Sequence, residues 1–310
     1  MQYINNPTDS YVIGIDIGGT NFRIGSVDTE LNLLQRQITS SSVFQEGGDA
    51  VEALAKAIAT LMEQTPGQCR GIFAGFPGTV SKDKTTVLSC PNLPSFDGRN
   101  VAELLQRRFN VPVLVEHEVL LLLTYDLTKY QLQDKSCVMA VYLGTGLGNA
   151  LYIHGRLLEG KNGTAGELGH IPVCRSQEQC SCGNVGCVEI YASGKVLEEI
   201  HRQNFPPGTP FTVLFKQHAQ LPAFAQFLDD TACAVATEIN ILDPDAVILG
   251  GGIITNSQFP YETLVERIKF RARKPYPAED LNFIRIEHNP DQGILGAAMY
   301  GLKRLQLLTD

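Results

Sequence analysis

The sequence lacks several features that would indicate a membrane, an export route or a nucleic-acid partner. It has no run of Lys and Arg, and 33 acidic against 25 basic residues give a net charge of −8. Such a chain offers no face that neutralises phosphates, so we expect no nucleic-acid partner. Its apolar stretch Val119–Leu123 is far shorter than the roughly 20 residues that span a bilayer. The polar segment Met1–Ser10 has no basic start followed by an apolar run, so we expect no signal peptide and a cytoplasmic protein without a membrane partner.

The chain also has no linker rich in Pro, Ser or Gly and no low-complexity tract. Its 310 residues are about twice the size of a typical single core, and a hydrophobic share of 44% is ample for burial. Strand-like and helix-like segments alternate along it, a pattern that indicates an α/β architecture. The expected strands include Tyr11–Asp16, Phe22–Val27, Gly71–Phe76, Val111–Val115 and Asp245–Leu249, and the expected helices include Ala50–Gln64, Val101–Phe109, Val119–Tyr130, Phe224–Leu242 and Gly293–Leu308.

A short pattern of strand, Gly/Thr turn and second strand occurs twice. The first copy runs from Val12 through Thr20 into Phe22–Val27, and the second from Val138 through Gly146 into Asn149–Ile153. The copies begin 126 residues apart, and each opens one half of the chain. The repeat predicts two similar subdomains that face a common cleft.

The turns of both copies are suited to hold phosphate groups. Glycine leaves backbone N–H groups open to phosphate oxygens and reaches positive φ, and a threonine hydroxyl adds a donor. Asp16, at the end of the first strand, could hold a water of a Mg²⁺ ion bound to such a phosphate. The alternative is a pair of tight hairpins with incidental glycines. The candidate residues are Gly18, Gly19 and Thr20 in the first turn and Gly144, Thr145 and Gly146 in the second.

Neither turn matches the common nucleotide-binding loops. The second turn lacks the G-x-G-x-x-G spacing, a strand rather than a helix follows the first, and no G-x-x-x-x-G-K-[ST] segment occurs. A dehydrogenase or a P-loop ATPase is therefore disfavoured. A third glycine-rich site, formed by Gly250, Gly251 and Gly252, follows a predicted buried strand and could admit an adenosine.

Three of the eight cysteines lie close together, since Cys180, Cys182 and Cys187 fall within eight residues. Glycines between them allow a sharp reversal, and His170, ten residues upstream, completes a Cys₃His set typical of structural zinc. The alternative is three semi-exposed thiols without a metal, although clustered exposed thiols are a liability in a cytosolic protein. The scattered cysteines have apolar neighbours and are expected to be reduced and buried or half-buried: Cys69, Cys90, Cys137, Cys174 and Cys233.

Two glutamates flank the proposed zinc set, Glu167 three residues before His170 and Glu189 two residues after Cys187. A metal at this set would hold both glutamates rigidly. A carboxylate accepts hydrogen bonds from two hydroxyl groups, so the pair suits a polyol better than an anion. Asn92, in a turn between prolines, could add an amide donor and acceptor. Each of these residues, taken singly, could equally be a solvated surface group.

A set of motifs in a fixed order gives the chain a family resemblance. The motifs are Asp16-Ile-Gly-Gly-Thr20, Gly75-Phe-Pro-Gly78, Pro91-Asn-Leu-Pro94, Leu143-Gly-Thr-Gly-Leu-Gly148, Gly166-Glu-Leu-Gly-His170, Cys180-x-Cys-Gly-x-x-Gly-Cys-x-Glu189 and Asp243-Pro-Asp-x-Val-Ile-Leu-Gly-Gly-Gly252. From about Val12 onward the chain resembles the ROK family (repressors, open reading frames and sugar kinases). Within that family, Gly75–Lys84 and Asn92-Leu-Pro94 most resemble the bacterial D-allose kinases.

The resemblance implies an actin/hexokinase-like (ribonuclease H-like) α/β fold of two domains around a central cleft. The N-terminal domain would comprise residues 1–115 and 293–310 with the first phosphate loop, and the second domain residues 116–292 with the other loop, the zinc and the adenosine. The resemblance also implies ATP and Mg²⁺ at Asp16 and both phosphate loops, adenosine against Gly250–Gly252, and a structural Zn²⁺. The sugar would face Gly75, Asn92, Glu118, Glu167, His170 and Glu189, with His170 reaching the zinc through its other ring nitrogen.

The chain departs from the resemblance at the catalytic position. Similar kinases place a catalytic Asp, which accepts the proton of the attacking sugar hydroxyl, just after the strand here predicted at Val111–Val115. This chain has Glu118 there, after His117 in place of the usual Asn or Arg, and Leu120 in place of a polar Asn. A glutamate reaches about one methylene further, and a misplacement of about 1 Å can lower a rate on the order of 10²-fold. We therefore predict a kinase that is slow or altered in its sugar preference.

Two functions are consistent with these residues. The first is ATP-dependent phosphorylation of a hexose, at the 6-hydroxyl of an aldohexose such as allose or glucose, with Glu118 as the base. The second is a sugar-binding sensor or regulator that has lost efficient transfer. ROK repressors carry a DNA-binding motif before the first phosphate loop, for which the ten residues before Tyr11 leave no room. The intact phosphate loops favour the enzyme, and a symmetric homodimer is the expected assembly.

Overall fold

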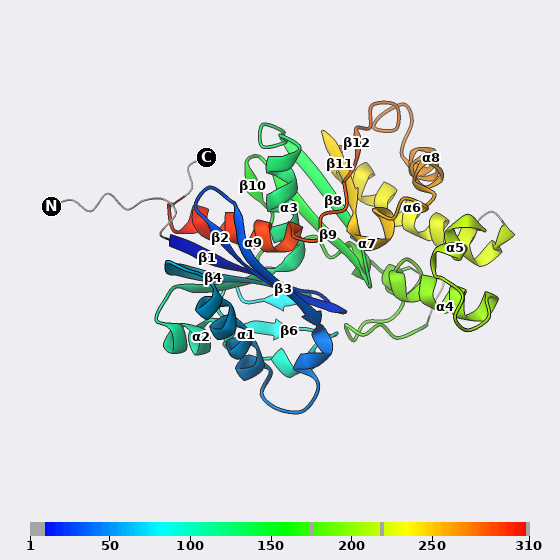
Figure 1. Ribbon diagram of the computed structural model, residues 1–310. Coiled ribbons are helices and arrows are strands. Elements are labelled where there is room, and N and C mark those ends of the chain that lie inside the picture. Colours follow the sequence, from blue (N-terminus) through cyan, green and yellow to red (C-terminus); the bar gives the residue numbers. More distant parts are fainter. Residues whose placement is uncertain (1–9, 174–176, 218–219, 308–310) are drawn as a thin grey trace. The chain divides into compact units, whose positions relative to one another are not determined.

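The computed structural model describes residues 10–173, 177–217 and 220–307 of the chain. The expectation for Met1–Ser10, apart from Ser10 itself, and the one for Cys174 lie outside these residues. The chain divides into two compact units, which are described separately (Figure 1). Unit 1 comprises residues 1–131, 159–164 and 289–310, and unit 2 comprises residues 132–158 and 165–288.

Unit 1 is built on a five-stranded mixed sheet. In spatial order its strands are β3 (Leu33–Ser40), β2 (Asn21–Asp28), β1 (Ser10–Ile17), β4 (Gln68–Phe76) and β7 (Val113–His117). The strands β3, β2 and β1 run antiparallel to one another, whereas β4 and β7 run parallel to β1. A small hairpin of β5 (Thr79–Val80) and β6 (Val87–Ser89) follows β4.

Helices cover both faces of this sheet (Figure 1). They are α1 (Ala50–Gln64), α2 (Val101–Phe109), α3 (Glu118–Lys129) and α9 (Gln292–Arg304), with the short 3-10 helices η2 (Ser41–Phe44) and η3 (Pro94–Phe96). Strand β1 is apolar on both sides, so Ile13 and Ile15 join the core with α1 and α2, whereas Val12 joins the core with α3 and α9. A stretch of small residues in α9 allows a close helix crossing, because a Cβ on Gly296 would lie 2.1 Å from the carbonyl oxygen of Leu121 in α3.

Unit 2 repeats the sheet of unit 1. In spatial order its strands are β10 (Arg156–Leu157), β9 (Leu147–Ile153), β8 (Cys137–Leu143), β11 (Ala246–Gly250) and β12 (Phe283–Arg285). Here too the first three strands run antiparallel to one another and the last two run parallel to the third. The two units therefore share strand order and strand direction, which confirms that the sequence repeat marks two similar subdomains.

The helices of unit 2 pack with β8 and β11 into a second core. They are α4 (Gly194–Asn204), α5 (Thr212–Lys216), α6 (Pro222–Leu242), α7 (Gly251–Ile254) and α8 (Tyr261–Arg271), with the 3-10 helices η4 (Leu168–His170) and η5 (Val188–Ile190). Met139, Val141 and Leu143 alternate along β8 and meet the apolar face of α6, including Phe227 and Val235. Helix α6 has 21 residues, yet no helix in the described part of the chain is long and apolar enough to cross a membrane.

Local signals predicted some boundaries well and others poorly. Both α1 and α2 have the predicted bounds, because capping acts locally; Asp49, for example, accepts the backbone N–H of Val51 at 2.8 Å. The strand predicted at Val111–Val115 instead spans Val113–His117. Pro112 has no N–H group to donate to a ladder, so regular pairing begins after it. Glu118 consequently stands at a strand-to-helix junction.

The cysteine predictions hold in part. Cys69 and Cys90 are buried and Cys137 is half-buried, as expected, but Cys233 is exposed. The prediction for Cys233 is wrong because this residue lies on the outer face of α6, one helical turn before the exposed Thr237, while the apolar stripe of the helix faces the core.

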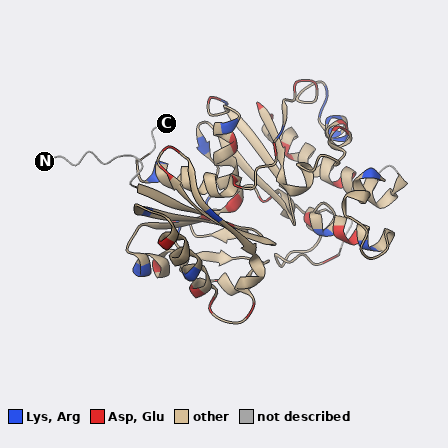
Figure 2. Ribbon diagram, viewed as in Figure 1, with Lys and Arg blue, Asp and Glu red and all other residues tan. Residues whose placement is uncertain are grey.

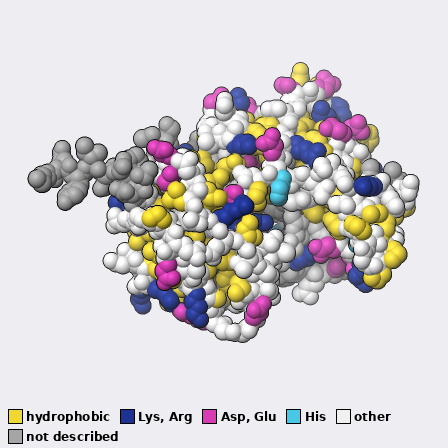
Figure 3. All heavy atoms as spheres, viewed as in Figure 1, with side chains coloured by type: hydrophobic (Ala, Val, Ile, Leu, Met, Phe, Trp, Pro, Cys, Tyr) yellow, Lys and Arg dark blue, Asp and Glu magenta, His cyan; other side chains and the backbone are white. Residues whose placement is uncertain are grey.

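Acidic and basic residues are interspersed along the chain in each unit (Figure 2). The face drawn in Figure 3 likewise mixes charged, neutral and hydrophobic side chains. Many charges pair locally: Arg108 of α2 lies 2.5 Å from Glu52 of α1, and Arg99 lies 2.7 Å from Asp49. Exposed ion pairs of this kind contribute at most about 1 kcal/mol each to stability. The buried charged residues are therefore the better candidates for a functional role.

Candidate functional site

Several of the candidate residues of unit 1 lie at one edge of its sheet. Asp16 on β1 is in register with Gly75 on β4, and Gly75 is in register with Glu116 on β7. Because these strands are parallel, their carboxyl ends meet at one edge, which is where open α/β sheets bind ligands. The first Gly/Thr turn follows β1 at this edge, and Glu118 follows β7.

Asp16 is 9% exposed and lies between β2 and α9. Its Oδ2 accepts a hydrogen bond from Nη1 of Arg23 on β2 at 3.0 Å. Burial raises the pKa of Asp16, and the charge of Arg23 opposes that shift. On the other side, a Cβ on Gly293 in α9 would lie 2.4 Å from Cγ of Asp16. Gly293 is therefore required where α9 passes the carboxylate.

The turn between β1 and β2 is closed by its own backbone. The N–H of Gly18 donates to the carbonyl of Asn21 at 2.9 Å, and the hydroxyl of Ser41 donates to the carbonyl of Gly18 at 2.7 Å. Gly18 and Gly19 are half-buried and Thr20 is exposed. The turn therefore presents a surface with little side-chain bulk at the sheet edge, as a phosphate cradle requires.

Glu118 is the first residue of α3, and His117 precedes it as the cap. A carboxylate in the first turn is stabilised by the positive end of the helix dipole. Its side chain is 21% exposed, and its Oε2 lies 3.4 Å from Nε2 of His117. A Cβ on Gly75 would lie 3.1 Å from both Cα and Cβ of Glu118, so the glycine leaves just enough room for the start of the helix.

Cys90, in the loop that carries Asn92, lies close enough to Glu118 for the two groups to interact through their charges. Burial raises the pKa of the Cys90 thiol to about 12, and the negative charge of Glu118 contributes to the shift. Asn92 itself is half-buried, and its carbonyl accepts a hydrogen bond from Nε2 of Gln45 at 3.0 Å. The structure thus brings the Cys90–Pro94 loop and Glu118, 28 residues apart from Cys90, into one neighbourhood of unit 1.

In unit 2, Glu189 holds the second Gly/Thr turn. Its Oε2 accepts the backbone N–H of Leu147 at 2.9 Å. A Cβ on Gly146 would lie 2.4 Å from the same oxygen, so this glycine makes room for the carboxylate. The carbonyl of Gly144 accepts the N–H of Gly194 at 2.9 Å, which ties the turn to the start of α4. The second turn is therefore held from two sides.

The three glycines after β11 differ in their surroundings. Gly251 has a φ of +85°, and a Cβ there would lie 2.4 Å from the carbonyl oxygen of Leu143. A Cβ on Gly250 would lie 2.4 Å from Cδ1 of Ile286. Gly251 is thus required by its backbone conformation and the nearby carbonyl, whereas Gly250 is crowded by the side chain of Ile286. Gly252 is exposed and has open space around its Cα, so it is the member of the three that a ligand could approach.

Glu167, His170 and Glu189 lie close together in unit 2. Oε2 of Glu167 is 3.7 Å from Nε2 of His170. Burial raises the pKa of Glu167, the imidazole of His170 opposes the shift, and the charge of Glu189 adds to it. Two carboxylates and an imidazole in one half-buried group offer several hydrogen-bonding atoms to the hydroxyls of a polyol.

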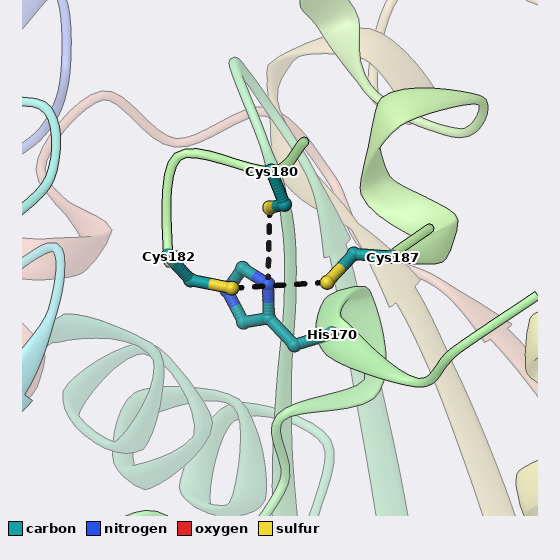
Figure 4. Close-up of side chains that lie close together, drawn as sticks. All are labelled: His170, Cys180, Cys182 and Cys187. Carbon is teal, nitrogen blue, oxygen red and sulfur yellow. Dashed lines mark hydrogen bonds between the residues drawn. The ribbon is translucent and has the colours of Figure 1, made fainter. Parts of the chain in front are cut away.

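The predicted Cys₃His set is assembled in the structure (Figure 4). Its four ligand atoms lie within 4.8 Å of one another. Sγ of Cys180 is 3.7 Å from Nδ1 of His170, and the Sγ atoms of Cys182 and Cys187 are 3.7 Å apart. A tetrahedral zinc with Zn–S bonds of about 2.3 Å would hold its sulfurs roughly 3.8 Å apart, so the set fits this ion. His170 thus turns Nδ1 toward the thiols and Nε2 toward Glu167.

The loop between the cysteines has the backbone that such a site needs. Gly183 adopts a φ of +91° and donates its N–H to the carbonyl of Cys180 at 3.0 Å. The N–H of Cys180 donates to the carbonyl of Asn184 at 2.8 Å. The tight turn brings Cys180 and Cys182 back over the start of η5, where Cys187 is the cap.

Sequence reasoning missed three charged residues near the candidate site of unit 1: Arg23, Lys84 and Glu116. Arg23 pairs with Asp16, and Lys84 pairs with Glu116. The two-residue period of β2 and β7 could have indicated which face each residue occupies. No sequence signal pairs Lys84 with Glu116, because the two are 32 residues apart and meet only after β7 has joined the sheet.

Comparisons with known proteins cover both units. A profile of the ROK family matches residues 12–304. The glucokinase of Thermotoga maritima is 27% identical over 310 aligned residues, which cover 93% of this chain and 96% of that protein. The N-acetyl-D-glucosamine kinase of Pectobacterium carotovorum subsp. carotovorum is also 27% identical, over 93% of this chain and 98% of that protein.

A solved structure shares the fold. The crystal structure of a ROK family glucokinase from Streptomyces griseus, in complex with glucose and AMPPNP, has a TM-score of 0.75 and 25% identity to this chain. The match covers 93% of this chain and 98% of the glucokinase. The expected actin/hexokinase-like α/β fold is thereby confirmed.

Proposed function

The chain belongs to the ROK family, and we propose that it transfers the γ-phosphoryl group of ATP to the 6-hydroxyl of an aldohexose such as allose or glucose. Its relatives phosphorylate sugars, as the names glucokinase and N-acetyl-D-glucosamine kinase state, so the chain is an ATP-dependent sugar kinase. One observation carries the finer proposal. Glu118 begins α3 at the same sheet edge as the turn after Asp16, which suits a base that acts beside a phosphate cradle.

In the proposed reaction Glu118 accepts the proton of the sugar hydroxyl as its oxygen attacks the γ-phosphorus. The new O–P bond forms while the bond to the leaving ADP oxygen breaks, and the proton stays on the carboxyl group until it passes to solvent. Phosphoryl transfer depends mainly on positioning and charge neutralisation, and a general base contributes about 10²–10⁴-fold. Bound Mg²⁺ would offset the negative charge of the phosphates.

The Gly/Thr turn of each unit would bind phosphate groups through its backbone atoms. We assign the phosphates to Gly18, Gly19 and Thr20 and to Gly144, Thr145 and Gly146. Asp16 would hold a water of the Mg²⁺ ion through the carboxylate oxygen that does not accept from Arg23. The adenosine would lie against Gly252, with Gly250 and Gly251 shaping the backbone there.

The candidate sugar-binding residues of unit 2 are Glu167, His170 and Glu189, and those of unit 1 are Asn92 and the backbone at Gly75. The proposed zinc would have a structural role, because protein atoms would fill all four of its coordination positions and leave none for a substrate. It would fix the ring of His170 through Nδ1 and so aim Nε2 at the sugar. Allose and glucose are the two candidate sugars, allose from the resemblance of Gly75–Lys84 and Asn92-Leu-Pro94 to the D-allose kinases and glucose from the glucokinase relatives.

A sugar-binding sensor is the alternative. The observation that favours it is the glutamate at position 118, where similar kinases have an aspartate. The longer side chain could move the carboxylate away from the position at which an aspartate would accept the proton. Transfer would then be inefficient, while the sugar would still bind.

The test is ADP release from Mg-ATP over a panel of allose, glucose, mannose, N-acetylglucosamine and N-acetylmannosamine. Wild-type protein should turn over at least one sugar, and Glu118→Gln should lose turnover at least about 100-fold while that sugar still raises the melting temperature. Turnover that survives in Glu118→Gln would remove this residue from the role of base. Sugar binding without turnover in the wild type would favour the sensor.

A further inference from the structure

Lys84 occupies an unfavourable position in unit 1. Its side chain is only 7% exposed, although lysine is almost never buried without a partner. Its φ is +62°, in the left-handed region where glycine or asparagine causes less strain. A strained backbone and a buried ammonium at the same residue indicate that the ammonium has a role.

The ammonium of Lys84 joins segments of unit 1 that are distant in sequence. Its Nζ lies 3.0 Å from Oε1 and 2.8 Å from Oε2 of Glu116 on β7, and 3.3 Å from Oε2 of Glu159. The carbonyl of Lys84 also accepts the backbone N–H of Val115 at 2.9 Å. Lys84 is therefore bound to β7 by its side chain and by its main chain.

Glu116 extends this attachment toward the start of α3. Its Oε1, which accepts from Lys84, also accepts the backbone N–H of His117 at 2.9 Å. His117 is the cap of α3, and Glu118 is the first residue of the helix. The side chain of Glu116 is 4% exposed, so this carboxylate lies in a setting where an unpaired charge would be costly.

We propose that Lys84 is a positioning residue for phosphoryl transfer, because its ion pair with Glu116 holds the junction of β7 and α3 and thereby the carboxylate of Glu118. This inference rests on the proposed function, in which Glu118 is the base. Gly75 leaves little room for Glu118 next to β4, and the pair of Lys84 and Glu116 holds the preceding residue through the N–H of His117. A base displaced by about 1 Å can lose on the order of 10²-fold in rate.

The test uses the neutral double variant K84M/E116Q as its main probe. Removing one partner alone leaves a buried charge uncompensated and can prevent folding, whereas replacing both partners of a buried ion pair is often neutral. The third member, Glu159, is 28% exposed and keeps Arg304 at 3.7 Å, so it is not left buried and unpaired in this variant. We expect kcat of the double variant to fall at least about tenfold while KM for ATP stays within about twofold. The melting temperature should stay within a few degrees of the wild-type value.

Two further variants separate positioning from general stability. K84R retains a cation that can pair with Glu116, so its kcat should lie close to the wild-type value and well above that of K84M/E116Q. R108M removes the exposed pair with Glu52 in the same unit and should leave kcat and both KM values unchanged. A folded double variant with wild-type kcat would overturn the proposal, as would an equal loss of kcat in R108M.

Hydrogen exchange of residues 115–119 distinguishes a failure of this inference from a failure of the proposed function. If the wild type turns over no sugar on the panel, the proposed function fails, and the exchange rate then decides the role of Lys84. Exchange at 115–119 should be at least about fivefold faster in K84M/E116Q than in the wild type, with α6 unchanged as the internal reference. Unchanged exchange at the junction would overturn the positioning role whatever the activity.

Discussion

Gly75 lies so close to Glu118 that a methyl group built on the glycine would be 3.1 Å from both the Cα and the Cβ atom of the glutamate. The contact joins the end of β4 to the first residue of α3. The absence of a side chain at Gly75 therefore leaves room for the first residue of α3 and for Leu121, whose Cδ1 atom would lie 3.0 Å from the same methyl group. A single added carbon should test this relationship.

Gly75→Ala should lower kcat by about 3- to 10-fold, since the new methyl group pushes the start of α3, and with it the carboxylate, by a fraction of the 1 Å that costs about 100-fold. Steady-state kinetics with the preferred sugar provides the measurement. Gly71→Ala is the matched control, because Gly71 is also buried in β4 but a Cβ there meets mainly the ends of the Phe73 and Leu305 side chains. Gly71→Ala should cost stability and leave kcat nearly unchanged. Full activity in Gly75→Ala would show that the contact does not matter.

Protein purified without chelator should contain one zinc per chain. Cys182→Ser should lose that zinc and lower the melting temperature by roughly 5–10 °C, because a structural zinc contributes directly to the free energy of unfolding. Elemental analysis and thermal unfolding are the measurements. Cys233→Ser, at an exposed cysteine outside the set, should keep both the zinc and the stability. Zinc-free protein of unchanged stability would contradict the assignment.

Gly146 and Gly252 should respond differently to the same substitution. Gly146→Ala places a methyl group 2.4 Å from Oε2 of Glu189, so it should disturb the second turn, lower the melting temperature and raise KM for ATP at least about tenfold. Gly252→Ala meets nothing within 4 Å, so its melting temperature should be that of the wild type. If adenosine lies there, KM for ATP should still rise about five- to tenfold. Wild-type ATP kinetics in Gly252→Ala would remove this residue from the nucleotide site.

Glu238 on α6 should make unit 2 less stable as the pH rises from about 4.5 to about 7. Burial raises the pKa of Glu238 to about 7 from 4.5, while a hydrogen bond from Nδ2 of Asn149 opposes the shift. Between pH 4.5 and 7 the folded state therefore binds more protons than the unfolded state, so this contribution to stability is fully present below pH 4.5 and lost above pH 7. At most about 3 kcal/mol is involved.

Glu238→Gln, which is neutral at every pH, should flatten this dependence and raise the free energy of unfolding at pH 8 relative to the wild type. Denaturant unfolding at pH 5, 6.5 and 8 is the measurement. Glu266→Gln, at an exposed position on α8, is the control and should follow the wild-type pH dependence. A Glu238→Gln protein with the wild-type slope between pH 5 and 8 would contradict the assignment.

Features that depend on neighbouring residues could be predicted from the sequence. The bounds of α1 and α2 follow from their caps and apolar spacing. The cysteines of the Cys₃His set share one short loop, so their spacing alone indicates that they converge. The repeat of strand, Gly/Thr turn and strand was enough to predict two units of the same topology.

Features that depend on long-range packing could not be predicted in this way. The strand β7 was predicted at Val111–Val115, two residues before its actual position at Val113–His117. The prediction therefore did not place Glu118 as the first residue of a helix. Pairs such as Lys84 with Glu116 and Glu189 with the N–H of Leu147 join residues 32 and 42 positions apart. No local pattern distinguishes a lysine that will be buried from one that will be solvated.

The sequence by itself thus determined the alternation of strands and helices, the two glycine turns and the ligand set for a metal, because each is encoded within a short stretch of the chain. Only the tertiary structure decided which carboxylate pairs with Arg23, which glycine leaves room for Glu118 and which lysine is buried against β7. The physical reason is that these contacts follow from strand register and helix crossing. Both are set when the whole core packs, and a shift of one residue would turn every side chain of a strand to the opposite face.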